Sequence, residues 1–141
     1  MNRRFMQQVL IGLLLVGTLL LSLGGRGLAM NDSDTVLIGW EDNGKTISLN
    51  EGQVVHLALA ANPGTGYGWI FNQSPQESVI KYITHYEQPN GTLAGSSVTE
   101  NWFFYCLAPG KTAIELKYAR SWEPKAIKTF TVTLLCSKEV K

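Results

Sequence analysis

The sequence predicts an all-β protein, an Ig-like antiparallel β-sandwich, preceded by a signal peptide. Short runs of alternating apolar and polar residues are separated by clusters of Gly, Pro and Asn, a pattern typical of sandwich strands and their turns. Beyond the first thirty residues, no segment keeps the 3.6-residue period of an amphipathic helix. The chain of 141 residues has room for one domain.

The N-terminus has the composition of an export signal. Two arginines precede an apolar run over residues 9–23, and Gly27 and Ala29 supply small residues at the −3 and −1 positions of a cleavage site. We therefore expect a signal peptide over residues 1–29 and a mature domain over residues 30–141, exported to the periplasm or secreted. The apolar run is shorter than the ~20 residues of a membrane span. An uncleaved anchor remains the alternative, and no cysteine follows the run to support lipid attachment.

Strands can be placed in order along the first half of the domain. Residues 46–49 and 53–60 flank a compact Asn-Glu-Gly turn, and residues 69–71 follow a glycine-rich loop. Residues 79–86 alternate in polarity and stop at Gln-Pro-Asn-Gly, after a possible helical turn over residues 74–79.

Three further strands fill the second half. Residues 100–107 are rich in aromatic side chains and end at Ala-Pro-Gly-Lys, a strong turn signal. Residues 112–118 and 128–136 alternate strictly, which predicts one buried and one exposed face for each. The residues expected to point inward are Ile114, Leu116, Tyr118, Phe130, Val132 and Leu134.

The charge balance argues against nucleic acid or an anionic membrane as a partner. Three of the twelve Lys and Arg residues lie in the leader. The mature domain would therefore carry nine Lys and Arg and eleven Asp and Glu, which makes it slightly acidic. We expect a monomer that needs no cofactor and does not bind the membrane once the leader is cleaved.

The two cysteines and two histidines do not form a catalytic or metal site by their spacing. Strand alternation turns Cys106 and Cys136 inward, which suits a disulfide or two buried thiols, since export permits either. His56 is expected on the outer face of its strand and His85 near a strand end. Two histidines alone do not make a zinc site, and no nucleophile–base pair is evident, so we expect neither a metal nor an enzyme.

The loop after residue 60 is the most informative feature. Asn62-Pro63-Gly64-Thr65-Gly66 combines a fixed proline φ with glycines that permit close backbone approach. Asn62 can close an Asx-turn, and Thr65 places a hydroxyl at the tip. A strand-like run follows, not the helix N-terminus that phosphate binding needs, so the interpretation is a preformed binding loop.

This loop resembles the Asn-Pro-Thr-Thr-Gly signature of the chagasin-type inhibitors of papain-like cysteine peptidases. Residues 118–122, Tyr-Ala-Arg-Ser-Trp, resemble the Arg-Pro-Trp loop of that family, and residues 93–100 stand where it has a glycine-rich loop followed by Thr-Glu. The likeness runs from about residue 47 to about residue 135, with three motifs in family order. The chain differs at Gly64 and Ser121, and it keeps only Gly95 of the glycine-rich loop.

The resemblance implies a function as well as a fold. It implies a reversible, non-covalent inhibitor whose loops at residues 62–66, 93–98 and 120–124 share one end of the sandwich and enter the peptidase cleft. The alternative is a non-inhibitory extracytoplasmic Ig-like adhesion or assembly module with drifted loops. The implied peptidase-binding residues are Asn62, Pro63, Gly64, Thr65, Gly66, Gly95, Ser96, Ser97, Arg120, Ser121 and Trp122.

Overall fold

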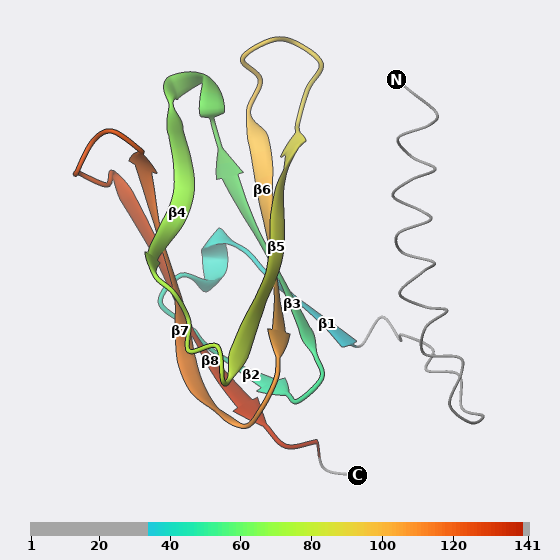
Figure 1. The fold of residues 1–141 in the computed structure, drawn as a ribbon. Coiled ribbons are helices and arrows are strands. Elements are labelled where there is room, and N and C mark those ends of the chain that lie inside the picture. The colour runs from blue at the N-terminus through green and yellow to red at the C-terminus, as the bar shows by residue number, and fades with distance from the viewer. Residues whose placement is uncertain (1–33, 140–141) are drawn as a thin grey trace. The chain divides into compact units, whose positions relative to one another are not determined.

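The computed structural model describes residues 34–139, which form two facing β-sheets of four strands each (Figure 1). Two short 3-10 helices lie in the connections, η2 (Trp40–Asp42) and η3 (Pro63–Thr65). The strands are β1 (Thr35–Ile38), β2 (Thr46–Asn50), β3 (Val54–Ala61), β4 (Tyr67–Gln73), β5 (Ile80–Pro89), β6 (Val98–Cys106), β7 (Gly110–Arg120) and β8 (Lys128–Ser137).

The strand order is β1-β3-β6-β5 in one sheet and β2-β8-β7-β4 in the other. The fold-class prediction of an all-β sandwich is confirmed, with one correction to its antiparallel description. The edge strands β1 and β2 pair in parallel with β3 and β8, whereas the other four pairings are antiparallel. A parallel edge strand cannot be joined to its neighbour by a tight hairpin, so each is reached through a longer path along the chain.

Strand alternation builds the core between the sheets. In β7, Ile114, Leu116 and Tyr118 are buried, while Glu115 and Lys117 between them keep more of their surface in solvent. The same alternation buries Phe130, Val132 and Leu134 in β8, as the sequence predicted. Large fully buried side chains contribute about 1.5–3 kcal/mol each to folding. In the opposite sheet these side chains are Val55, Leu57, Leu59, Ile80 and Phe104.

The aromatic strand β6 divides between the core and the sheet face. Trp102 and Phe104 are buried, whereas Phe103 and Tyr105 point to the other face and are only partly covered. His56 lies on that outer face, stacked on Phe103 at a ring-centroid distance of 4.5 Å. The placement of His56 on an outer face is therefore confirmed.

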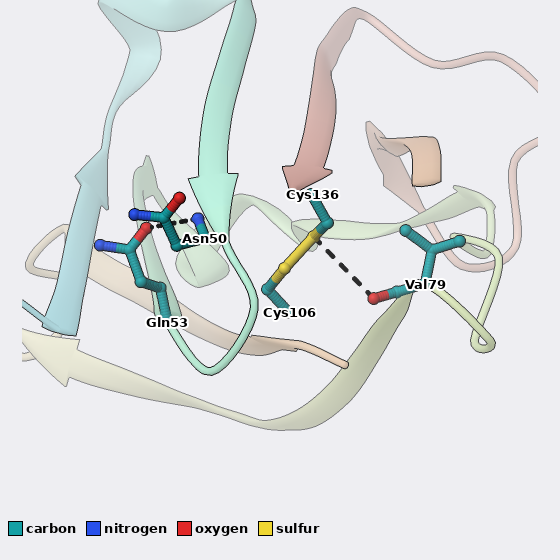
Figure 2. Close-up of a disulfide and its surroundings, with 5 residues drawn as sticks. All are labelled: Asn50, Gln53, Val79, Cys106 and Cys136. Atoms are coloured by element: carbon teal, nitrogen blue, oxygen red, sulfur yellow. Dashed lines mark hydrogen bonds between the residues drawn. A yellow bond between two sulfur atoms is a disulfide. The ribbon is translucent and has the colours of Figure 1, made fainter. Parts of the chain in front are cut away.

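A disulfide joins the two sheets. Cys106 ends β6 and Cys136 lies near the end of β8, with their Cα atoms 6.1 Å apart (Figure 2). Both sulfurs are buried, as the inward orientation of the two side chains requires. Of the two states that the sequence left open, the structure contains the bridge. The Cys136 sulfur of the bridge also lies 4.0 Å from the Val79 carbonyl oxygen.

The predicted leader, with its cleavage site after Ala29 and the domain boundary at residue 30, lies outside the described residues. Within residues 34–139 there is no helix of the length and apolar character needed to cross a membrane. The possible helical turn over residues 74–79 is a single turn, in which the amides of Val79 and Ile80 both donate to the Gln76 carbonyl.

Candidate functional site

Three connections meet at one end of the sandwich, the upper end in Figure 1. We call them the first loop (residues 62–66, between β3 and β4), the second loop (residues 90–97, between β5 and β6) and the third loop (residues 121–127, between β7 and β8). The disulfide lies where β6 and β8 end, and both strands start from this loop end. The three sequence-predicted binding segments are thus brought together at one end of the fold.

The first loop is a single 3-10 turn held by its own backbone. The Thr65 amide donates to the Asn62 carbonyl at 3.1 Å, and the Gly66 amide donates to the Pro63 carbonyl at 2.9 Å. The Asx-turn prediction was wrong, because the Asn62 side chain makes no capping hydrogen bond. The Thr65 hydroxyl closes the turn in its place, donating to the Asn62 carbonyl at 2.6 Å.

Gly66 ends this turn at a φ of +80°, in the left-handed region that favours glycine. It also lies under the third loop, because a Cβ at this position would lie 2.6 Å from the Trp122 ring. Gly64 has no such requirement: its φ is not in the left-handed region, and a Cβ there would lie 3.7 Å from the Gly95 Cα of the second loop. The first loop therefore lies close to both of its neighbours.

The chain on each side of the first loop is hydrogen-bonded to a strand of the opposite sheet. The Asn62 amide donates to the Tyr118 hydroxyl of β7 at 2.8 Å. The indole N–H of Trp69, on the other side, donates to the Ala60 carbonyl of β3 at 3.0 Å. These bonds run between the sheets, so they fix the loop against both layers.

Arg120 connects the first and third loops. Its Nε–H donates to the Thr65 carbonyl at 2.9 Å, and one of its terminal N–H groups donates to the Glu123 carboxylate at 2.9 Å. The guanidinium also lies over the Tyr67 ring, 4.5 Å from its centroid. The bond to Glu123 is the main reason why the pKa of Arg120 is raised above its ordinary value. The planar, multidentate guanidinium makes contacts that a lysine could not reproduce.

Trp122 is the exposed aromatic residue of the third loop. It is 69% exposed, and the Arg120 guanidinium carbon lies over its ring, 5.9 Å from the ring centroid. The Glu123 amide donates to the Arg120 carbonyl at 3.1 Å, so residues 120–123 form a β-turn with Ser121 and Trp122 at its two central positions. The turn holds the indole over Gly66, with most of its surface available to a partner.

The second loop is closed by short hydrogen bonds within it. The Ser96 hydroxyl donates to the Leu93 carbonyl at 2.7 Å, and the backbone amide of Asn90 donates to the Ser97 carbonyl at 2.9 Å. Gly95 has a φ of +80°. Leu93 is 81% exposed, the largest value among the exposed large hydrophobic side chains of the described residues. It was not singled out from the sequence as a binding residue, although an apolar residue in a polar loop is a recognisable signal.

One carboxylate is buried beneath these loops. Glu100 of β6 is 3% exposed, and its carboxylate accepts a hydrogen bond from the Trp69 amide at 3.0 Å. Burial is the main cause of its raised pKa, which the Trp69 N–H lowers in part. Strand alternation puts Glu100 on the same face of β6 as Trp102 and Phe104, but it was not singled out from the sequence as a buried carboxylate.

The remaining polar groups do not form a second site. His56 pairs with the Asn101 side chain at 2.8 Å, and His85 with the Tyr82 hydroxyl at 2.9 Å. In residues 34–139 no three His, Cys, Asp or Glu side chains gather to hold a metal ion. An open hollow lies at the disulfide end, lined by Glu51, Gly52, Tyr105, Lys138 and Glu139, away from the loops.

Comparison with known proteins finds matches to a family of peptidase inhibitors. Residues 48–134 match the family model described as "Chagasin family peptidase inhibitor I42". Chagasin from Trypanosoma cruzi is 34% identical over 84 residues, which cover 57% of this chain and 76% of that protein.

Two solved structures share the fold. The cysteine protease inhibitor EhICP2 from Entamoeba histolytica superposes with a TM-score of 0.66 at 18% identity, over 73% of this chain and 96% of that chain. PbICP-C, solved in complex with falcipain-2, superposes with a TM-score of 0.52 at 17% identity, over 75% and 99% of the two chains. At this level of identity the likeness shows the fold alone.

Proposed function

Because the chain belongs to the chagasin family of peptidase inhibitors, we propose that its loop end fills the active-site cleft of a papain-like cysteine peptidase. The protein is an inhibitor and not an enzyme, and its partner is a peptidase. The observation that supports the loop end as the binding surface is the linkage of all three loops: Arg120 bonds to Thr65, Trp122 covers Gly66, and Gly64 faces Gly95.

The first loop would lie over the catalytic cysteine, with the second and third loops on either side. Inhibition would follow because the 3-10 turn occupies the substrate channel without presenting an extended, cleavable peptide bond. The turn is closed by its own hydrogen bonds and anchored at Tyr118, so little conformational entropy remains to be lost on docking. Such binding is reversible and involves no covalent step.

The exposed side chains divide into contact and positioning residues. Trp122 and Leu93 have most of their surface free and are of the types that supply apolar contact area. Arg120 donates two of its five guanidinium N–H groups within the domain, to Thr65 and Glu123, so its role is mainly to hold the two loops together. The Thr65 hydroxyl donates to the Asn62 carbonyl and accepts a bond from the Tyr67 amide at 3.5 Å, which leaves one lone pair to accept a bond from the peptidase.

We also propose that the domain works outside the cytoplasm, with cleavage after Ala29. The composition of residues 1–29 supports export, and the Cys106–Cys136 bridge suits an oxidising compartment. N-terminal sequencing of the protein recovered from its producing cells tests the cleavage site. A retained leader would favour the anchored alternative.

The inhibition is tested by titrating residues 30–141 into papain and cathepsin-like enzymes while following a fluorogenic substrate. We expect an inhibition constant below about 1 μM, which corresponds to roughly −8 kcal/mol or tighter. Activity should return on dilution, and the inhibitor should remain intact by mass spectrometry. Trypsin, whose nucleophile is a serine, is the control and should be unaffected.

A folded domain that inhibits none of a broad panel of papain-like enzymes would contradict the proposal. That outcome would favour the adhesion or assembly alternative, to which the loop substitutions at Ser121 and at Ser96 and Ser97 point.

A further inference from the structure

We propose that Glu100 is a positioning residue, which sets the place of the first loop relative to the second through its bond to the Trp69 amide. The inference rests on the proposed function, since it concerns how the loop end is presented to the peptidase. Glu100 contacts no partner itself, because only 3% of its surface is exposed.

Glu100 stands at the junction of the two loops. It is the third residue of β6, which starts directly after the second loop. Its hydrogen-bond partner, Trp69, is the third residue of β4, which starts directly after the first loop. The strands belong to different sheets, so the 3.0 Å bond from the Trp69 N–H to the Glu100 carboxylate spans the sandwich at the base of both loops.

The surroundings are shaped for this carboxylate. A Cβ on Gly68 would lie 3.5 Å from a Glu100 carboxylate oxygen, an ordinary contact distance, so β4 runs directly beside this carboxylate. The Trp69 indole N–H donates to Ala60 on the other side of the first loop. Trp69, which follows the first loop, is thus bonded to the β3–β6 sheet at Ala60 and at Glu100. Of these two bonds, only the one to Glu100 reaches β6, the strand that follows the second loop.

A structural role here needs an acceptor for the Trp69 amide, and a neutral glutamine could also supply one. Burial of an ionisable group is costly, whereas removal of the acceptor altogether would leave the buried Trp69 N–H unpaired. Glu100 is nevertheless the only buried carboxylate among residues 34–139. A buried group retained against this cost fits a requirement for a strong, directed hydrogen-bond acceptor at one place.

The charged neighbours of Glu100 lie on β5. Burial is the largest cause of the raised pKa of Glu100, and the Trp69 N–H lowers this pKa in part. Glu87, the register partner of Glu100 on β5, raises the pKa further. His85 lies further along β5, stacked on Trp102. The Trp102 indole has no acceptor in hydrogen-bonding geometry but lowers the pKa of Glu100 slightly. The β3 partner, Leu59, does not titrate.

The test compares Glu100→Leu, which removes the acceptor, with Glu100→Gln, which keeps an acceptor oxygen of the same reach. Glu87→Gln is the matched control, because it removes a carboxylate from the neighbouring strand and leaves the Trp69 bond intact. We expect dissociation from papain to be at least tenfold faster for Glu100→Leu, and within about threefold of the parent for Glu100→Gln and Glu87→Gln. Unaltered dissociation of Glu100→Leu, or equal acceleration in Glu100→Gln, would overturn the inference.

A pH series separates positioning from simple stability. Protonation of Glu100 removes the charge assistance from the Trp69 bond, so the affinity ratio of the parent to Glu100→Gln should fall as the pH falls through the Glu100 pKa. The peptidase's own titration cancels in this ratio. A ratio that is independent of pH would contradict the inference.

A measurement without peptidase keeps the inference independent of the proposed function. In ¹⁵N spectra of the full domain, the chemical shift of the Trp69 amide should change with pH in the parent and stay constant in Glu100→Gln. Hydrogen exchange of the amides over residues 62–69 should be slower in the parent and in Glu100→Gln than in Glu100→Leu. If Glu100→Leu does not fold, the first comparison still decides. Failure to inhibit, with a titrating Trp69 amide, would refute only the proposed function; a Trp69 amide that does not sense Glu100 would refute the positioning role.

Discussion

Replacement of Ser121 by proline should stabilise the third loop and slow dissociation from the target. Ser121 is the first central residue of the β-turn closed by the Glu123 amide and the Arg120 carbonyl, the position where proline is favoured. Its own amide makes none of the turn hydrogen bonds of this loop, so proline removes no bond there. Arg120 ends strand β7 and is already extended, as the residue before a proline must be.

The size of the gain follows from the unbound loop. A proline in a compatible site gains about 0.4–1 kcal/mol by restricting the unfolded chain. The same restriction of the free loop would lower the cost of docking and give about a two- to fivefold tighter complex, seen mainly as slower dissociation. Dissociation rates and melting temperatures of Ser121→Pro would be measured beside Ser121→Ala, which removes the hydroxyl without fixing φ.

Two outcomes would refute this reasoning. A lower melting temperature for Ser121→Pro than for Ser121→Ala would show that the turn cannot accept the ring. A higher melting temperature with faster dissociation would show that the bound loop differs from the turn seen here, and hence that the third loop is adapted to another partner.

The other predictions concern the contacts beneath and beside the loops. Trp122→Ala should weaken inhibition by about 2 kcal/mol and leave the melting temperature nearly unchanged, since the side chain is 69% exposed; a large loss of stability would show that the indole is part of the core. Gly66→Ala should cost about 1–2 kcal/mol of unfolding free energy through its φ of +80°, and the new Cβ should displace the indole, which fluorescence in a single-tryptophan background would detect. Reduction of the bridge between cysteines 30 residues apart should cost about 3.6 kcal/mol, measured by urea unfolding with and without a reductant; an unchanged midpoint would contradict it. Because burial raises the pKa of Glu100, ionisation of its carboxyl opposes folding, and the parent should lose stability as the pH rises from the ordinary Glu pKa through the raised one; urea midpoints across pH should show Glu100→Gln gaining on the parent over that interval and keeping a constant gain above it.

The strands with strict alternation could be predicted from the sequence, because their period of two reports directly which face is buried. This holds for β7 and β8, where alternate residues disappear into the core. Strand β1 was missed: it has only four residues, and its Leu37 is 73% exposed, so it shows no buried face of its own. Its pairing with β3 is parallel and comes from tertiary contact, which no local pattern contains.

The site was predictable as a set of segments but not as a set of contacts. The resemblance placed residues 62–66 and 120–122 near each other, yet it did not show that Arg120 bonds to the Thr65 carbonyl. Nor could the Asn62 side chain be decided, since Asn62 and the Thr65 hydroxyl compete to close the same turn. The inward face of Glu100 follows from the alternation of β6, but its hydrogen-bond partner, the Trp69 amide, belongs to the opposite sheet and could not be found from a local pattern.

The disulfide joins the two sheets at the end opposite the loops, so a small tilt between the sheets displaces the loop tips most. The covalent link between the sheets lies at the end of β6, whose nine residues span about 30 Å from the loop end. Over that length, a tilt of about 2° between the sheets moves a loop tip by about 1 Å. The spacing of the three loops therefore depends on hydrogen bonds at the far end from the bridge, and a change of a single inter-sheet bond there would alter the width that the inhibitor presents.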